Sequence, residues 1–184
     1  FAISPKGDVV FRLDLDGEAD SAPVFAKDGT IVFAAGNQVH AARRGGDLAW
    51  RFAAKGKVFT SPAVTQDGLV VFGSQDHHVY GLAGGTLAWS LDLGADVDGS
   101  PAIGDDGGIY IGTDRGEVVR IDAPAKGAPT IAWRTQVGGF VRGMLSIARS
   151  GDVLAGTYGP TPRVVRLGAT DGVVRGAFAI RGTG

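Results

Sequence analysis

The sequence contains no cysteine, a single asparagine and only two glutamates. The absence of cysteine excludes disulfides, thiolate metal sites and cysteine nucleophiles. Charged residues make up 20% of the chain and nearly cancel, leaving a formal net charge of −1. Such a balance gives no electrostatic footprint for nucleic acid or for an anionic membrane. No apolar run is long enough to cross a bilayer as a helix, so we expect neither nucleic-acid binding nor direct membrane insertion.

Helical periodicity is also missing, whereas glycine is abundant. The chain has 31 glycines in 184 residues, while average usage of roughly 7% would give about 13. Apolar runs such as LVVFGS and GIYIGT have the length of single strands and are separated by Asp-Gly and Gly-Gly pairs, which favour tight turns. The sequence therefore predicts an all-β fold of short strands.

A repeat with a period near 40 organises the chain. Three stretches open alike, at Ser21 (SAPVFAKDG), Ser61 (SPAVTQDG) and Ser100 (SPAIGDDG), and a weaker copy starts at Met144 (MLSIARSG). The first residues match only the second half of a unit. We predict one domain, 1–184, with units at 1–20 (second half only), 21–60, 61–99, 100–143 and 144–184.

Within the second unit, turn residues separate four strand-like segments: SPAV, LVVFGS, HVYGLA and TLAWSLDL. A repeat of about 40 residues that forms one four-stranded antiparallel sheet is typical of a β-propeller blade. About four and a half blades are predicted, as a partial ring or as a fragment of a seven- to eight-bladed propeller. A stacked solenoid of sheets is the structural alternative.

A large aromatic residue recurs at one position of the repeat. It lies four residues after a turn glycine in three units, and the same place is reached after an insertion between Pro124 and Pro129. We predict that these aromatics fill the wedge between neighbouring blades. The aromatics are Phe11, Trp50, Trp89 and Trp133, and the turn glycines are Gly7, Gly46, Gly85 and Gly172. In the last unit Gly176 takes the aromatic position and Phe178 follows two residues later.

The stretches VYGLAGGTLAW and VRLGATDGVV resemble the tryptophan-docking motif of quinoprotein-like propellers, the PQQ-like repeat family. Some members are dehydrogenases that hold pyrroloquinoline quinone and Ca²⁺. The non-enzymatic branch resembles the propeller lipoprotein of the outer-membrane β-barrel assembly machinery. That resemblance implies an exported scaffold of the periplasm or cell envelope that contacts other proteins.

Residue patterns for catalysis and metal binding are weak. No G-x-S-x-G, Walker A or H-E-x-x-H stretch is present. His77 and His78 are adjacent, so on a strand they would point to opposite faces, and His40 is isolated. The stretch DLDGEAD makes Asp14, Asp16 and Asp20 candidate Ca²⁺ ligands. The equivalent stretch from Asp92, DLGADVDG, is also acidic, but the equivalents in the other units, AAKGKV and QVGGFV, lack the acids. A solvated connection is therefore preferred, and we predict no catalytic residue, cofactor or metal.

Three functional hypotheses follow. The first is a non-catalytic scaffold that binds other proteins through its blade loops. The second is a fragment of a larger quinone-dependent dehydrogenase or other propeller enzyme whose catalytic residues lie outside this chain. The third is ligand capture by Arg43, Arg44 and Arg142, because paired arginines suit carboxylates or phosphates. The half unit at the start also predicts either missing blades of the same parent chain or two copies that complete a ring.

Overall fold

Short antiparallel strands and tight turns build the chain in this computed structural model, which describes residues 1–124 and 127–180, and no helix occurs within those ranges. A two-stranded sheet pairs β1 (Ala2–Ile3) with β2 (Val9–Phe11). The first four-stranded sheet consists of β3 (Val24–Phe25), β4 (Ile31–Ala35), β5 (Gln38–Ala42) and β6 (Leu48–Ala53). The second consists of β7 (Ala63–Val64), β8 (Val70–Gly73), β9 (His78–Ala83) and β10 (Thr86–Asp92).

Two further sheets follow the same plan. The third consists of β11 (Ala102–Ile103), β12 (Ile109–Gly112), β13 (Glu117–Asp122) and β14 (Thr130–Gln136). The fourth consists of β15 (Ser146–Ile147), β16 (Val153–Gly156), β17 (Arg163–Leu167) and β18 (Val174–Ala179). In every sheet, strands that are consecutive in the sequence are hydrogen-bonded neighbours. We call these sheets blades 1 to 4.

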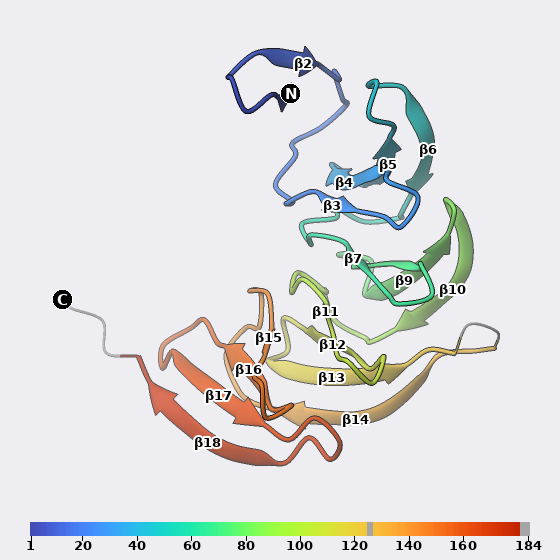
Figure 1. Ribbon diagram of the computed structural model, residues 1–184. Coiled ribbons are helices and arrows are strands. Elements are labelled where there is room, and N and C mark those ends of the chain that lie inside the picture. The colour runs from blue at the N-terminus through green and yellow to red at the C-terminus, as the bar shows by residue number, and fades with distance from the viewer. Residues whose placement is uncertain (125–126, 181–184) are drawn as a thin grey trace.

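The blades stand side by side around the concave side of an open ring (Figure 1). The short strands β3, β7, β11 and β15 lie on the inner side, and β6, β10, β14 and β18 lie on the outer side. The two-stranded sheet occupies one end of the ring and blade 4 the other. The predicted propeller of about four and a half four-stranded blades is confirmed, and the solenoid is excluded.

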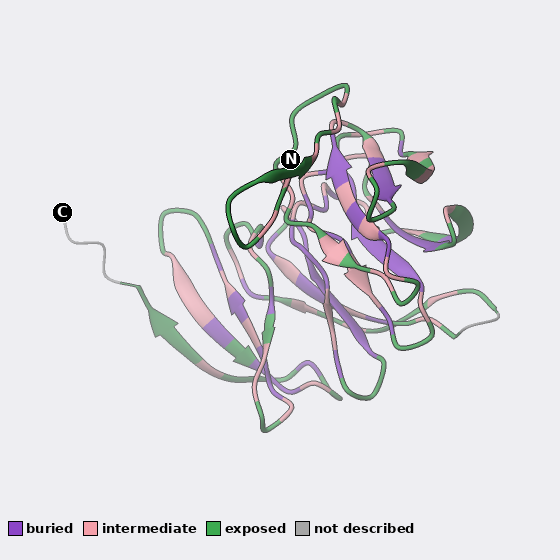
Figure 2. Cartoon of the chain, turned by 45° about the horizontal axis from the view of Figure 1, so that its top comes forward, coloured by how far each residue is buried: buried purple, intermediate pink, exposed green. Residues whose placement is uncertain are grey.

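The hydrophobic core lies between successive blades. All four residues of strand β8 are buried. Since alternate residues of a strand point to opposite faces, both faces of β8 are covered. Phe72 packs with Val32 of blade 1, whereas Val71 packs with Ile109 of blade 3. Figure 2 shows the buried residues concentrated on the middle strands of the blades. The continuous apolar runs of the sequence are therefore strands sandwiched between two neighbours.

A bulge precedes the recurring aromatic position in each sheet. In blade 1, Trp50 pairs with Ala41 and Leu48 pairs with Ala42, so Ala49 is the extra residue. The same irregularity occurs in the other three blades and in the two-stranded sheet. A bulge re-aims the residues next to it and increases the local twist. The repeated bulge therefore fixes the direction of each aromatic side chain.

A hydroxyl group at the entry to a blade fastens the inner strand to the next one. Thr60 Oγ1 accepts the Gly73 N–H and donates to the Gly73 carbonyl, both at 3.0 Å. Ser21 does the same with Ala34, at 2.8 and 3.1 Å. Ser21 is thus the structural equivalent of Thr60, and the sequence comparison that pairs Ser21 with Ser61 is shifted by one residue.

Candidate functional site

Three of the recurring aromatics lie against a turn glycine of the next sheet. A Cβ built on Gly46 would stand 3.0 Å from Phe11, one on Gly85 would stand 2.5 Å from Trp50, and one on Gly172 would stand 2.6 Å from Trp133. All three glycines have positive φ, at +95°, +85° and +65°. Only glycine meets both demands without strain, since it has no Cβ and tolerates positive φ.

Trp89 lies over a glycine of its own blade. A Cβ built on Gly81, its partner on β9, would stand 2.3 Å from Trp89 Cε2. The residue is 7% exposed and belongs to the cluster that contains Ile109 and Ile121 of blade 3. Part of the turn that corresponds to Gly85 falls on residues 125–126, outside the described residues. Gly7 also has positive φ, +89°, with no atom within 4 Å of a built Cβ.

Polar contacts reinforce the junction of blades 3 and 4. Trp133 Nε1 donates to the Ala169 carbonyl at 2.8 Å, and Arg120 donates to the same oxygen at 2.9 Å. Arg120 also pairs with Asp106 and Asp122, each at 2.9 Å, and lies over the Tyr110 ring. The side chain of Arg120 is 13% exposed, so these bonds satisfy a largely buried cation, as burial requires.

The two faces of the ring differ in the segments they carry. One face carries the turn between the second and third strands of each blade and the segments that join successive blades; we call it the connection face. The opposite face carries the other two turns of each blade and is called the hairpin face. Antiparallel pairing fixes this division, because alternate strand ends lie on opposite faces.

The turn after β8 binds the connection that precedes it. Asp76 accepts hydrogen bonds from the Lys55 N–H at 2.9 Å, from the His78 N–H at 3.1 Å and from the Tyr80 hydroxyl. Burial alone would raise the pKa of Asp76, but these hydrogen bonds outweigh it and lower the pKa. Burial and the same carboxylate raise the pKa of Tyr80. Asp76 is therefore a charged anchor between blades 1 and 2.

A second charged group lies on the connection face. It consists of Arg142 and three carboxylates, Asp96, Asp98 and Asp114. The Arg142 guanidinium donates two hydrogen bonds to the Asp114 carboxylate, at 2.9 and 2.6 Å, and lies 3.9 Å from Asp98. Gln75 donates to one oxygen of Asp98 at 3.3 Å. The other oxygen, Oδ1, is buried and has no partner among the described residues. Burial, together with Asp114 and Asp96, raises the pKa of Asp98 despite Gln75 and Arg142.

Large apolar residues are exposed in the segments next to Arg142. Phe140 is 42% exposed, Tyr158 58% and Met144 63%. The backbones of Phe140 and Tyr158 bond to each other in both directions at 2.8 Å, which ties the blade 3 connection to the β16–β17 turn. The Arg142 guanidinium lies 4.7 Å from the centre of the Phe140 ring. This group, Phe140, Arg142, Met144 and Tyr158, is called the aromatic patch.

Sequence reasoning singled out Arg142 but missed its neighbours in the aromatic patch, Phe140, Met144 and Tyr158. Its members lie in connections and turns where the repeats differ, so no periodic signal marks them. Besides Arg142, the departure of the fourth copy from the Ser-Pro pattern, with Met144 in that place, was a further hint.

The other residues singled out from the sequence remain dispersed. Asp14 pairs with Arg12 at 2.6 Å and is largely exposed. Within the described residues, no group of three or more His, Asp and Glu side chains has an arrangement that could hold a metal, so Asp14, Asp16 and Asp20 are not brought together as ligands. Arg43 and Arg44 lie in the β5–β6 turn on the hairpin face, whereas Arg142 lies on the connection face. The three arginines therefore do not form one anion site.

His77 and His78 also have separate partners. His77 Nε2 lies 3.3 Å from Asp96, and His78 Nδ1 lies 2.8 Å from the Asp76 carbonyl. His40 is buried and stacks on Phe33, and burial lowers its pKa. In the part of the chain described, there is no helix with the length and apolarity needed to span a bilayer.

Solved structures share this fold at low sequence identity. BamB from Moraxella catarrhalis aligns with a TM-score of 0.77 and 15% identity over 93% of this chain and 56% of that one. Quinohemoprotein alcohol dehydrogenase from Comamonas testosteroni aligns with a TM-score of 0.75 and 16% identity over 88% of this chain and 35% of that one. A protein of unknown function from Bacteroides caccae gives a TM-score of 0.65 and 17% identity over 94% and 68%. The chain therefore spans little more than half of the BamB it resembles.

Sequence comparison defines the family. No curated protein sequence matches the chain significantly. The family model described as outer membrane protein assembly factor BamB matches residues 2–84 and 75–175. These matches cover almost every strand of the propeller. The chain therefore belongs to the outer membrane protein assembly factor BamB family of PQQ-like repeat propellers.

Proposed function

We propose that this protein is a non-catalytic, protein-binding scaffold of the bacterial cell envelope that takes part in the assembly of outer membrane proteins. The observation that carries the proposal is the family model, which matches residues 2–84 and 75–175 and is named for an assembly factor. A rigid propeller suits such a role, because its blades hold variable loops in fixed positions.

The aromatic patch is the surface we assign to partner binding. Aromatic residues, methionine and arginine are enriched in protein interfaces and dominate their binding energy. Phe140 and Tyr158 are held in place by their mutual backbone bonds, and Arg142 by Asp114. Such a preformed surface loses little conformational entropy when a partner binds.

Photo-crosslinking tests this assignment. Benzoylphenylalanine in place of Phe140 should crosslink to a component of the outer-membrane β-barrel assembly machinery in living cells. Leu87, on the outer strand β10 and 46% exposed, is the matched control position and should give no such product. Crosslinking to that machinery from Leu87 alone, or from neither position, would contradict the proposal.

The second candidate is a fragment of a quinone-dependent dehydrogenase. It is favoured by the likeness to quinohemoprotein alcohol dehydrogenases, which extends over about nine tenths of this chain. Calorimetric titration with pyrroloquinoline quinone and Ca²⁺ separates the two functions. The scaffold predicts no saturable heat, whereas stoichiometric binding or dye reduction would favour the enzyme.

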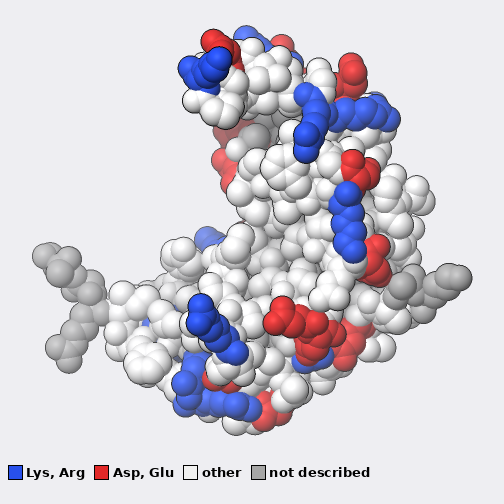
Figure 3. Space-filling model, viewed as in Figure 1, with Lys and Arg blue, Asp and Glu red and all other residues white. Residues whose placement is uncertain are grey.

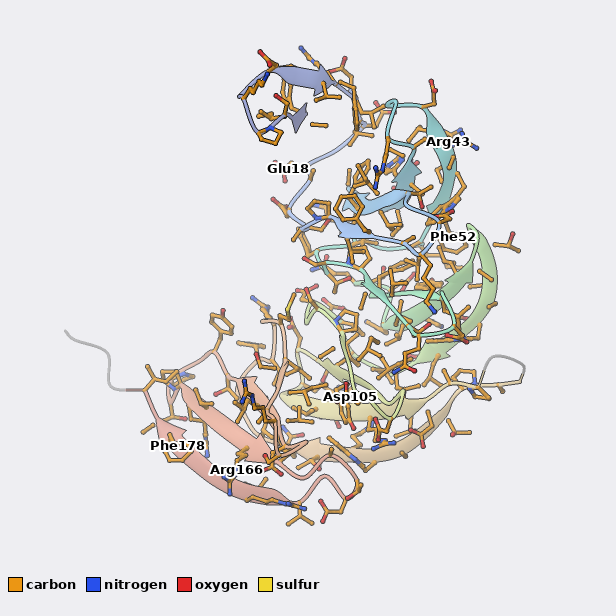
Figure 4. The ribbon with its side chains drawn as sticks, viewed as in Figure 1. Glu18, Arg43, Phe52, Asp105, Arg166 and Phe178 are labelled. Atoms are coloured by element: carbon orange, nitrogen blue, oxygen red, sulfur yellow. The ribbon has the colours of Figure 1, made fainter. Side chains whose placement is uncertain are left out.

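Both ends of the open ring expose apolar side chains. Val174 and Phe178 are 45% and 64% exposed on blade 4, and Ile3 and Val9 are 64% and 58% exposed on the two-stranded sheet. Figure 4 shows Phe178 on the outer strand at the free end. Apolar faces of this kind favour association. We propose that further blades cover them, either from the same parent chain or from a second copy, and the mass of the purified protein in solution distinguishes these arrangements.

A further inference from the structure

A groove follows the inner strands on the hairpin face, opposite to the aromatic patch. It consists of two pockets, with volumes of about 410 and 500 Å³, that share Gly104 and Asp105. The first pocket reaches from Phe25 of blade 1 to Asp105 of blade 3, and the second continues to Arg149 of blade 4. The groove therefore crosses all four complete blades.

Equivalent residues of the inner strands form an apolar floor. Phe25, Val64, Ile103 and Ile147 each occupy the last position of β3, β7, β11 or β15 and line one of the two pockets. Phe25 is 66% exposed, although it belongs to a strand. A row of apolar side chains at blade spacing offers contacts to the side chains of an extended segment rather than to one compact ligand.

The rim of the groove carries a fixed order of charges. The equivalent positions in the turns that follow the inner strands are Lys27, Gln66, Asp105 and Arg149, so the order from blade 1 to blade 4 is positive, neutral, negative, positive. Among the described residues, none of these three charged groups has an ion-pair partner. Figure 4 labels Asp105 at the β11–β12 turn, and Figure 3 shows acidic and basic side chains interspersed on the face that it presents.

Neighbouring charged groups, by contrast, are neutralised by the fold. Asp106 pairs with Arg120 at 2.9 Å. Asp152 has a side chain only 9% exposed and pairs with Arg175 at 3.2 Å and with Arg166 at 3.6 Å. The rim charges are therefore the ones left available to a partner.

The groove is also preformed. The Gln66 side chain donates to the Asp105 carbonyl at 3.2 Å and so ties the turn of blade 2 to that of blade 3. Gln66 thus serves as a structural link, while Lys27, Asp105 and Arg149 line the groove.

We propose that this groove binds an extended peptide segment of a partner protein whose acidic, basic and acidic side chains face Lys27, Asp105 and Arg149. The spacing is unequal, because Lys27 and Asp105 lie two blades apart and Asp105 and Arg149 one blade apart. The mixed charge excludes a uniform polyanion as the occupant. This surface goes beyond the aromatic patch and does not depend on it.

Fluorescence anisotropy with labelled synthetic peptides tests the proposal. The peptides carry acidic, basic and acidic residues separated by valine and serine spacers, with the first spacer longer than the second. Control peptides have the charges inverted or the two spacers exchanged. The matching peptide should bind saturably and the controls at least about fivefold more weakly, the range expected of exposed ion pairs acting together.

Charge reversal in the protein provides the decisive comparison. Asp105→Arg should weaken the matching peptide about fivefold, and a peptide with glutamate in place of its basic residue should regain that affinity. Because Asp105 makes no side-chain bond among the described residues, the variant should fold, as thermal unfolding will check. Equal affinity for all peptides, or no binding by any, overturns the proposal. Leu87→Ala, on the outer strand β10, should leave peptide binding unchanged. If the peptide proposal fails, the scaffold function is still tested separately by crosslinking from position 140.

Discussion

The indole of Trp50 lies over Gly85 of the neighbouring blade so closely that a Cβ on that glycine would stand 2.5 Å from Trp50 Cγ. The adjacent Gly84 also has positive φ, +56°, but no atom lies within 4 Å of its built Cβ. Substitutions at Gly84 and Gly85 therefore distinguish two effects at one turn, since both incur backbone strain but only a substitution at Gly85 overlaps Trp50.

Gly85→Ala should destabilise the protein more than Gly84→Ala. Both variants incur the left-handed backbone cost of about 1 kcal/mol, and Gly85→Ala adds overpacking against Trp50 of about 1 to 3 kcal/mol. Urea unfolding of the two variants measures the difference. Equal midpoints would show that the Trp50 contact does not hold blades 1 and 2 together.

Trp89→Ala should cost about 3 to 5 kcal/mol of unfolding free energy, because it opens a cavity between blades 2 and 3. Leu87→Ala is the matched control two residues away on the same strand; it is 46% exposed and should change stability by less than about 0.5 kcal/mol. A Trp89→Ala variant as stable as the control would mean that the ring is not a packing element.

The buried hydroxyl of Thr60 satisfies both backbone groups of Gly73. Thr60→Val keeps the shape but leaves these groups without a partner, at a cost of about 1 to 3 kcal/mol. Thr60→Ser keeps the hydroxyl and should lose less. Chemical denaturation of both variants tests this order, and a more stable valine variant would refute it.

The raised pKa of Asp98 has a definite consequence for stability. A carboxyl group with a higher pKa in the folded state favours folding when protonated, so its contribution is lost as pH rises from the ordinary aspartate value, about 3.9, through the folded value. Ionised Asp98 therefore lowers the stability of the folded protein at neutral pH. Asp98→Asn removes that destabilisation and preserves an acceptor for Gln75. The stability gain of the variant over the wild type should therefore be present at neutral pH and shrink toward acid.

Thermal unfolding of both proteins over a pH series measures that difference. Comparing the two proteins at each pH isolates the contribution of residue 98 from effects that both proteins share. A gain that grows toward acid would reverse the sign of the argument, and a variant less stable than wild type at neutral pH would show that the Arg142 interaction outweighs burial.

Much of the fold could be predicted because its signals repeat. Asp-Gly and Gly-Gly turns mark the hairpins, and a tryptophan returns at one position of successive units. The direction of that tryptophan could not be predicted in the same way, since it depends on a bulge at Ala49 and its equivalents, which shifts the register by one residue. An alanine before each of the three tryptophans was a visible but ambiguous sign.

The candidate site was less predictable because it depends on contacts between units. Arg142 and Asp114 are 28 residues apart, and their pairing requires the connection after β14 to meet the β12–β13 turn, while Phe140 and Tyr158 join that connection to blade 4. The one-residue shift between Ser21 and Ser61 has a similar origin. The sequence match favours the serine letters, whereas the backbone aligns the two hydroxyls that perform the same bonding.

The measurement that tests the scaffold function most directly is the affinity of this protein for purified outer-membrane β-barrel assembly complex depleted of its own propeller subunit. We predict saturable binding by the wild type and by Leu87→Ala, and at least tenfold weaker binding by Phe140→Ala, since aromatic anchors carry about 2 kcal/mol or more at interface centres. No binding by the wild type, or equal binding by all three proteins, would contradict the assignment of the aromatic patch as the partner-binding surface.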